Sequence, residues 1–247
     1  MKIDVTYIGH SGFLIKWDAC YWLFDYYRGD IPELDPGKAL IVFVSHRHGD
    51  HYNPDIFSLF LKHPLVTYVL SSDIKQGYAA GTGHDKGRIP GERIKSVKPS
   101  ETYEIPDGDG NSINIKTLKS TDEGVGFLLE YMGKTIYHAG DLNLWVWKEE
   151  SKQYNNNMTA SFRREMAVLK DKTIDIAFAP LDPRQEEWYH MGLDELLGTA
   201  RVRHVFPMHF WDQPDIIQKY KRERADNFPQ TSIMDIKGPG QNFKLEI

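Results

Sequence analysis

The sequence contains a single cysteine, Cys20, among 247 residues, which excludes an internal disulfide framework and a cysteine-based zinc module. No apolar run approaches the roughly 18 residues that a membrane-spanning helix needs. Positive charge is not in excess either, because 30 Lys and Arg residues stand against 35 Asp and Glu residues and give a net charge of −5. This balance argues against a surface that binds the phosphate backbone of nucleic acids.

The first residues alternate apolar and polar side chains (Ile3, Val5 and Tyr7 are the apolar ones), which is typical of a strand and not of a signal peptide. We therefore expect a cytoplasmic protein that does not enter a membrane. The basic run at 219–224 contains Glu223 and falls on a predicted helix, so we interpret it as a solvated helix face. The sequence leaves the oligomeric state open.

Short strand patterns dominate the chain, with a few helical patterns between them. We expect strands at 2–8, 12–17, 21–25, 40–44, 66–70, 112–118, 126–131, 134–138 and 174–179. Spacing and capping residues predict helices at 54–62, 162–170, 193–202 and 214–225, and polar composition predicts loops at 81–91 and 148–157. Because no linker composition separates the two similar halves, we predict one α+β domain over residues 1–247, with two packed sheets flanked by helices.

The motif with the clearest chemistry is SHRHGDH, residues 45–51. It follows the apolar run 40–44, which is typical of a strand buried on both faces. Because residues two apart on an extended chain point the same way, His46 and His48 can bind one ion together. The following turn directs Asp50 and His51 to a nearby point, and this mixture of ligands suits Zn²⁺, Mn²⁺ or iron. The alternative interpretation is a solvated histidine-rich loop.

Further motifs follow in order along the chain: TYIGHSGFLI at 6–15, LFD at 23–25, IYHAGD at 136–141 and FPMHF at 206–210. Together with H-x-H-x-D-H, they resemble the metallo-β-lactamase superfamily of hydrolases. The first two motifs are similar to the branch that contains L-ascorbate-6-phosphate lactonase. The resemblance covers nearly the whole chain, and it implies a four-layer αββα sandwich with up to two divalent metal ions at one sheet edge.

The resemblance also implies which residues bind the two ions. Asp141 matches the bridging carboxylate of the family, and His209 matches its last metal-binding histidine. The implied ligands of the second ion are Asp50, His51 and His209, and those of the first ion include His46 and His48. Without the resemblance, Asp141 reads as a turn residue after a glycine, and His209 as a histidine packed at a strand end.

One departure from the family concerns the first ion. Many relatives have a third histidine for this ion in the middle of the chain, but the corresponding stretch here, KSTDEGVGF at 119–127, has none. Asp122 is the predicted substitute, with Glu123 next, and an oxygen ligand there favours Mn²⁺ over Zn²⁺. The alternatives are a simple polar turn, or a turn in which the hydroxyl of Ser120 or Thr121 contacts the substrate.

Other residues are expected to support the site without binding metal. Asp25 matches a buried aspartate of the family and is predicted to accept a hydrogen bond that orients a histidine ligand, unless it is a turn residue. His10 and His138 are predicted either to orient such groups or to contact the edge of the substrate. The alternative for both is an ordinary buried histidine.

The loop at 182–192 resembles the family loop that closes over the site. Arg184, Tyr189 and His190 are therefore candidates to bind an anionic group of the substrate, with simple surface positions as the alternative. Two tryptophans after the IYHAGD motif are candidates for the pocket wall, or else for packing: Trp145 and Trp147. The stretch GTGHDKG at 81–87 lacks the spacing of a phosphate-binding loop.

Two divalent ions that share Asp141 would lower the pKa of a bound water toward neutrality, so the predicted activity is hydrolysis by a metal-bound hydroxide. Asp50 is placed to orient this nucleophile, which makes Asp50 and Asp141 the predicted catalytic residues. The resemblance favours a small anionic ester, lactone or phosphodiester as substrate. Two alternatives stay open: a nuclease of the same superfamily, against which the charge argues, and a non-catalytic metal-binding scaffold, which the missing histidine favours.

Overall fold

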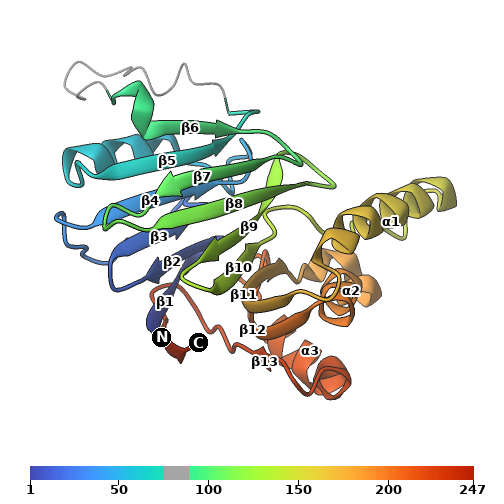
Figure 1. Cartoon of the computed structure of the whole chain (residues 1–247). Helices are drawn as coiled ribbons and strands as arrows, with labels where there is room; N and C mark the ends of the chain where they lie inside the picture. The colour runs from blue at the N-terminus through green and yellow to red at the C-terminus, as the bar shows by residue number, and fades with distance from the viewer. Residues whose placement is uncertain (75–88) are drawn as a thin grey trace.

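Two β-sheets packed face to face form the body of the computed structural model, which describes residues 1–74 and 89–247 (Figure 1). The first sheet has the order β14 (Asn242–Glu246), β1 (Lys2–Gly9), β2 (Gly12–Lys16), β3 (Cys20–Phe24), β4 (Ala39–Val44), β5 (Val66–Ser71) and β6 (Ile94–Val97). The second has the order β13 (Ser232–Ile233), β12 (Arg201–Met208), β11 (Thr173–Pro180), β10 (Lys134–His138), β9 (Val125–Tyr131), β8 (Ser112–Lys119) and β7 (Thr102–Pro106).

The two sheets repeat one arrangement. In the first, the pairs from β14 to β3 are antiparallel and those from β3 to β6 are parallel. In the second, the pairs from β7 to β10 are antiparallel and those from β10 to β13 are parallel. Most of the candidate site residues lie in loops at the carboxyl ends of the parallel strands, as in other sheets with parallel strands.

The central strand β4 shows why the run 40–44 is apolar throughout. Side chains alternate between the two faces of a strand, and Phe43 points to the second sheet, where its ring centroid lies 5.5 Å from that of Phe127. Leu40, Val42 and Val44 point the other way and pack under the 3₁₀ helix η1 (Pro54–Leu61). Both faces are therefore buried, as the sequence predicts.

Helices form the outer layers. The α-helices α1 (Lys152–Met166), α2 (Met191–Thr199) and α3 (Asp215–Arg224) lie against the second sheet, and η1 covers the outer face of the first (Figure 1). The predicted α+β, four-layer αββα arrangement is thus confirmed, with a 3₁₀ helix where the sequence predicts a helix at 54–62. None of the described helices combines the length and the apolarity that crossing a membrane requires.

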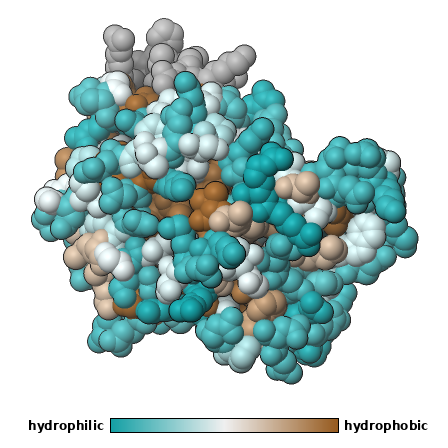
Figure 2. Space-filling view, turned by 45° about the vertical axis from the view of Figure 1, so that its right-hand side comes forward, coloured by the Kyte–Doolittle hydropathy of each residue, from teal (hydrophilic) through white to brown (hydrophobic). Residues whose placement is uncertain are grey.

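The predicted loop at 148–157 is wrong, because α1 begins within it. Ser151 caps the helix, since its Oγ accepts a hydrogen bond of 3.1 Å from a backbone amide of the first turn. Phe162 and Met166 bury the other end of the helix in the core. The polar first turns carry little apolar periodicity, which is why the sequence resembles a loop there; in Figure 2 they form a largely hydrophilic arm.

Other element boundaries also differ from the prediction. The helix predicted at 193–202 ends at Thr199, because the backbone becomes extended at Ala200 and β12 begins at Arg201. The helix predicted at 162–170 is the end of α1 followed by the 3₁₀ helix η4 (Ala167–Leu169). Of the predicted loop 81–91, residues 81–88, including the GTGHDKG stretch, lie outside the described residues, and η3 (Gly91–Arg93) follows them.

Candidate metal centre

The loop after β4 places three histidines at one edge of the first sheet. His46 and His51 are buried, whereas the side chain of His48 is 40% exposed. The ring centroid of His46 lies 4.2 Å from that of His51 and 4.7 Å from that of His48. The structure therefore brings the three imidazoles together, as their spacing predicts.

Asp25 lies beneath this loop, just after β3. Its carboxylate accepts hydrogen bonds from the backbone amide and the hydroxyl of Ser45, at 2.7 and 2.6 Å, and from Nδ1 of His51 at 2.8 Å. Burial alone would raise the pKa of Asp25, but the neighbouring imidazoles of His138 and His51 lower it. The predicted hydrogen bond between Asp25 and a candidate histidine ligand is therefore present.

Asp141 occupies the middle of the cluster. The preceding Gly140 has a φ of +52°, and a Cβ there would lie 2.6 Å from the Cβ of Ser45, so only glycine allows this close approach. Oδ2 of Asp141 lies 3.3 Å from Nε2 of His46, and Oδ1 lies 3.1 Å from Nε2 of His51. Since its two oxygens face different histidines, the carboxylate has the geometry of a bridging ligand.

His209 reaches the cluster from the second sheet, directly after β12. Its Nε2 lies 3.4 Å from Oδ1 of Asp141, and its Nδ1 lies 2.9 Å from Oδ2 of Asp182. Burial raises the pKa of Asp182, but His209 and Arg184 outweigh it and hold that pKa at about 2, so Asp182 is an ionised acceptor. Asp182 was missed in the sequence; the available signal was an acidic residue just beyond a buried strand.

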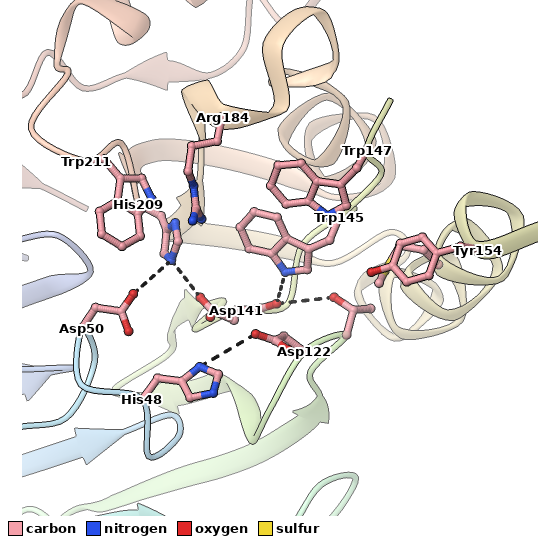
Figure 3. A pocket seen from close by; sticks show the side chains of 12 residues that line it. His48, Asp50, Asp122, Asp141, Trp145, Trp147, Tyr154, Arg184, His209 and Trp211 are labelled. Carbon is pink, nitrogen blue, oxygen red and sulfur yellow. Dashed lines mark hydrogen bonds and ion pairs between the residues drawn. The ribbon is translucent and has the colours of Figure 1, made fainter. Parts of the chain in front are cut away.

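Asp50 lies between the cluster and solvent. Its Oδ2 lies 3.5 Å from Nε2 of His10 and 3.9 Å from Nε2 of His209, and its side chain is 27% exposed. Figure 3 shows Asp50, His209 and Asp141 converging on one point. The sequence predicts only a supporting function for His10, but one of its ring nitrogens points at a candidate ligand.

The turn between β8 and β9 brings Asp122 to His48. A Cβ on Gly124, which has a φ of +71°, would lie 2.0 Å from the backbone oxygen of Ser45, so glycine lets this turn close on the histidine loop. Oδ2 of Asp122 then lies 3.9 Å from Nδ1 of His48. Glu123, the other predicted substitute, accepts two hydrogen bonds of 2.7 Å from Arg47, and its Oε2 also lies 3.6 Å from Nε2 of His48.

The donor atoms in the cluster fit divalent metal ions. Buried atoms without a hydrogen-bond partner among the described residues include Nε2 of His10, His46, His51 and His209, and Oδ1 of Asp141. Each such atom costs about 1–3 kcal/mol if nothing binds it. Ligand atoms within 4.8 Å of one another form these groups: His10, Asp50, His51 and His209; His46, His51 and Asp141; His46, His48 and Asp50; His48, Asp122 and Asp141. We call these residues together the metal centre.

Comparison with known proteins agrees with this geometry. The family model described as the beta-lactamase superfamily domain matches residues 4–157. The chain belongs to the metallo-β-lactamase superfamily. A protein of Opitutus terrae named UPF0173 metal-dependent hydrolase is similar to it, with 26% identity over 250 residues that cover 98% of this chain and 99% of the relative. Membership of the branch that contains L-ascorbate-6-phosphate lactonase stays a prediction.

Solved structures share the fold at lower identity. Igni18, a metallo hydrolase from Ignicoccus hospitalis, is 18% identical with a TM-score of 0.65, and the match covers 100% of both chains. The diiron β-hydroxylase CmlA from Streptomyces venezuelae is 11% identical with a TM-score of 0.60, over 99% of this chain and 54% of that one. Identities this low show the fold alone, and superfamily members of this fold differ in their reactions.

The metal centre of this superfamily member opens into a pocket of about 340 Å³. Opposite the metal centre, the wall is aromatic and carries one guanidinium group; it consists of Trp145, Trp147, Tyr154, Arg184 and Trp211 (Figure 3). Trp145 donates a hydrogen bond of 2.8 Å from Nε1 to the backbone oxygen of Asp141, and its ring lies parallel to that of Trp147. The guanidinium of Arg184 lies 4.6 Å from the ring of Trp211. Trp145, Trp147 and Arg184 therefore line the pocket, one of the arrangements the sequence allowed for them.

The structure places two candidates for substrate contact, Tyr189 and His190, outside the lining of the pocket. His190 marks the start of α2, and its Nδ1 lies 2.7 Å from a carboxylate oxygen of Asp194 one turn later, so both face a separate depression. Tyr189 donates its hydroxyl hydrogen to Glu223 on α3 at 2.6 Å. Neither belongs to the described residues that line the pocket.

Three further candidates are held by hydrogen bonds within the protein. His138 donates from Nε2 to the backbone oxygen of Ser11 at 3.0 Å, and its Nδ1 accepts from the amide of Gly140 at 3.2 Å. It therefore supports the turn before Asp141 and cannot contact the edge of a substrate. The hydroxyl of Ser120 accepts from the amide of Asp122, and that of Thr121 donates to the backbone of Asn143.

Proposed function

We propose that this protein is a hydrolase that binds two divalent metal ions around Asp141 and cleaves a small anionic ester, lactone or phosphodiester. The observation that carries the proposal is the convergence of unpaired, buried imidazole nitrogens on the two oxygens of one carboxylate. Two comparisons support the same conclusion. The chain matches the family model of the beta-lactamase superfamily domain, and a relative named as a metal-dependent hydrolase matches it over nearly its whole length.

We assign each candidate ligand to one of the two ions. His46, His48 and Asp122 would hold the first ion, and Asp50, His51 and His209 the second, with Asp141 between them. Such ions, when bound, lower the pKa of a water molecule and polarise the bond to be cleaved. Zn²⁺ and Mn²⁺ both suit the donors, with iron as a third option, and the exposed oxygen of Asp122 favours Mn²⁺ at the first position.

The buried carboxylates determine which ring nitrogen of each histidine faces the metal centre. Asp25 and Asp182 accept hydrogen bonds from Nδ1 of His51 and of His209, so each ring directs Nε2 at Asp141. Asp50 is one of the carboxylates that line the pocket, with Asp122 and Asp141. Burial raises the pKa of Asp50, but the neighbouring imidazoles of His10 and His51 outweigh burial and lower it below the ordinary value. Asp50 is therefore ionised at neutral pH, and the carboxylate oxygen that does not bind the ion can accept a hydrogen bond from the attacking water.

The pocket supports a small substrate with negative charge. Its volume of about 340 Å³ suits a small molecule. Among the described residues that line the pocket, Arg184 carries the positive charge of a lysine or arginine side chain. Two of the guanidinium nitrogens of Arg184 bind Asp182, and the exposed part of the group faces the pocket. No continuous track of basic residues leads to the pocket along its described lining, which argues against a nucleic-acid substrate.

Turnover of three probe classes tests the proposal: bis(p-nitrophenyl) phosphate, a p-nitrophenyl carboxylate ester and a small lactone, each with protein loaded with Zn²⁺ or Mn²⁺. We expect hydrolysis of at least one class, abolished in Asp141→Asn. In Arg184→Met, KM for an anionic substrate should rise by about tenfold with little change for a neutral analogue. Arg163→Met, which removes an exposed arginine that pairs with Glu195, is the matched control.

Two results would replace the proposal. RNA binding that is tight and falls steeply with salt, with RNA cleavage lost in Asp141→Asn, would make the protein a nuclease. Two bound ions per chain with no turnover of any class would make it a metal-binding scaffold.

A further inference from the structure

His10 lies in the turn between β1 and β2, where the chain is distorted. The register of the two strands shifts between Tyr7 and Gly9, and His10 has a φ of +52°, in the left-handed region that side chains rarely adopt. Irregularities of this kind re-aim a side chain and are concentrated at functional sites. We therefore expect the distorted backbone to place the His10 ring at a functional position.

The ring of His10 is turned into the metal centre. Its centroid lies 4.2 Å from that of His209 and 4.7 Å from that of Trp211. The backbone oxygen of His10 also accepts a hydrogen bond of 3.3 Å from the amide of His209, so the two residues hold each other in place. The residue is 5% exposed, and its Nε2 has no hydrogen-bond partner among the described residues.

The carboxylate of Asp50 does not provide Nε2 of His10 with a hydrogen-bond partner. Nε2 of His10 lies 3.5 Å from Oδ2 of Asp50, longer than the roughly 2.7–2.9 Å of a charge-assisted hydrogen bond. Zinc bonds to nitrogen and oxygen are about 2.0–2.2 Å, so two ligands of one ion lie about 3–4 Å apart. The separation of 3.5 Å therefore suits two ligands of one ion, and the atom belongs to one group with those of His51 and His209.

We propose that Nε2 of His10 is a ligand of the second metal ion, beside Asp50, His51, His209 and the shared carboxylate of Asp141. This inference rests on the proposed function and adds a donor to one of its two metal positions. The second ion would then have three imidazole ligands in a buried setting, whereas the first has His46, the partly exposed His48 and the exposed Asp122.

The two positions are consequently unequal. Three buried imidazoles favour metals that bind nitrogen strongly, and they hold such an ion tightly. The first position is richer in oxygen and open to the pocket, so its ion is the more easily exchanged. The second position therefore fills first on titration with Zn²⁺.

Cadmium NMR tests the ligand directly in the unmodified protein. With ¹⁵N-labelled histidine and two equivalents of ¹¹³Cd²⁺, a one-bond coupling appears only at ring nitrogens that bind an ion. We expect coupling at the rings of His10, His46, His48, His51 and His209. If the other four rings show coupling and His10 does not, this proposal is overturned and the proposed function stands. If no ring shows coupling, both are overturned.

Two variants extend the test to affinity. His10→Asn keeps a residue that adopts the left-handed backbone readily, but its shorter side chain cannot reach the ion. In chelator competition with Zn²⁺, the tighter step should weaken by more than about 100-fold, beyond the 10–100-fold that loss of a group supporting a ligand costs. The weaker step should stay unchanged.

The control is His204→Gln, which replaces a partly buried histidine of β12 outside the pocket and should change neither step. A loss of about 100-fold or less in His10→Asn would mean that His10 only positions Asp50, and it would overturn the proposal. If His10→Asn fails to fold, the count of cadmium-coupled rings in the unmodified protein still decides between the two cases.

Discussion

Oδ2 of Asp182 lies 2.9 Å from Nδ1 of His209, with both residues buried. On the opposite sheet, Asp25 stands in the same relation to His51 at 2.8 Å. An ionised carboxylate can only accept a hydrogen bond, so each contact places the proton on Nδ1 and leaves Nε2 facing Asp141. The two sheets thus use one device to orient the two histidines on which the second metal position depends.

Replacing Asp182 by Asn tests this device. The amide keeps the shape of the side chain but removes the negative charge beside His209, so we expect metal affinity at the second position to fall by about 10–100-fold. The control is Asp175→Asn, a buried aspartate near the other end of the same strand that pairs with Lys134 and Arg203. Chelator competition measures both variants, and equal affinities would contradict an orienting function for Asp182.

Asp122 should be needed for the first ion. In Asp122→Ala, we expect one ion to remain tightly bound and the other to be lost on dialysis, because the donor group of His48, Asp122 and Asp141 then loses one carboxylate. Glu123→Gln breaks an exposed ion pair with Arg47 and should leave two ions bound. Metal content per chain after dialysis distinguishes the two, and loss of an ion in the Glu123 variant instead would assign that carboxylate as the ligand.

Gly124 and Gly133 allow a matched test of how the Asp122 turn closes. Both have left-handed backbones, with φ of +71° and +74°, but only at Gly124 would a Cβ meet the backbone of Ser45, at 2.0 Å. Gly133→Ala should cost about 1–2 kcal/mol of unfolding free energy for the backbone alone. Gly124→Ala should cost about 2–5 kcal/mol, since overpacking adds to it, and should also weaken the first metal position. Urea unfolding of metal-free protein gives the comparison, and equal costs would contradict the close approach.

Cys20 should be inert in the folded protein. Burial raises the pKa of its thiol to about 12, and its sulfur lies 3.9 Å from the hydroxyl of Tyr131 inside the core. A thiol whose pKa is raised stays protonated at pH 8, and the protonated form is not the nucleophile. Iodoacetamide at pH 8 should therefore label Cys20 only after denaturation, as mass spectrometry of the intact chain can show. Rapid labelling of folded protein would contradict this burial of β3.

The parts of the site that the sequence predicted are those whose geometry is local. His46, His48 and His51 follow one buried strand within six residues, so strand alternation and one turn suffice to bring them together. Asp141 and His209 each follow a strand as well, and a family motif marks each of them. The continuous apolar run of β4 likewise reveals burial on both faces without knowledge of the rest of the fold.

The parts that the sequence did not predict depend on contacts between distant segments. Asp182 meets His209 only because β11 and β12 are parallel neighbours, and its place just beyond a buried strand does not by itself reveal that contact. His190 lies in the same loop as Arg184, but the start of α2 turns it toward Asp194. The left-handed backbone that directs His10 at the metal centre is set by the strand irregularity, which the sequence GHSG does not specify.

Metal content per chain tests the central claim most directly. Protein purified without added metal, saturated with Zn²⁺ or Mn²⁺ and dialysed, should hold two ions per chain by elemental analysis. Asp141→Asn should hold no more than one and should lose turnover of any substrate found. One ion or none in the unmodified protein, or two ions in the Asp141 variant, would contradict a metal centre built around that carboxylate.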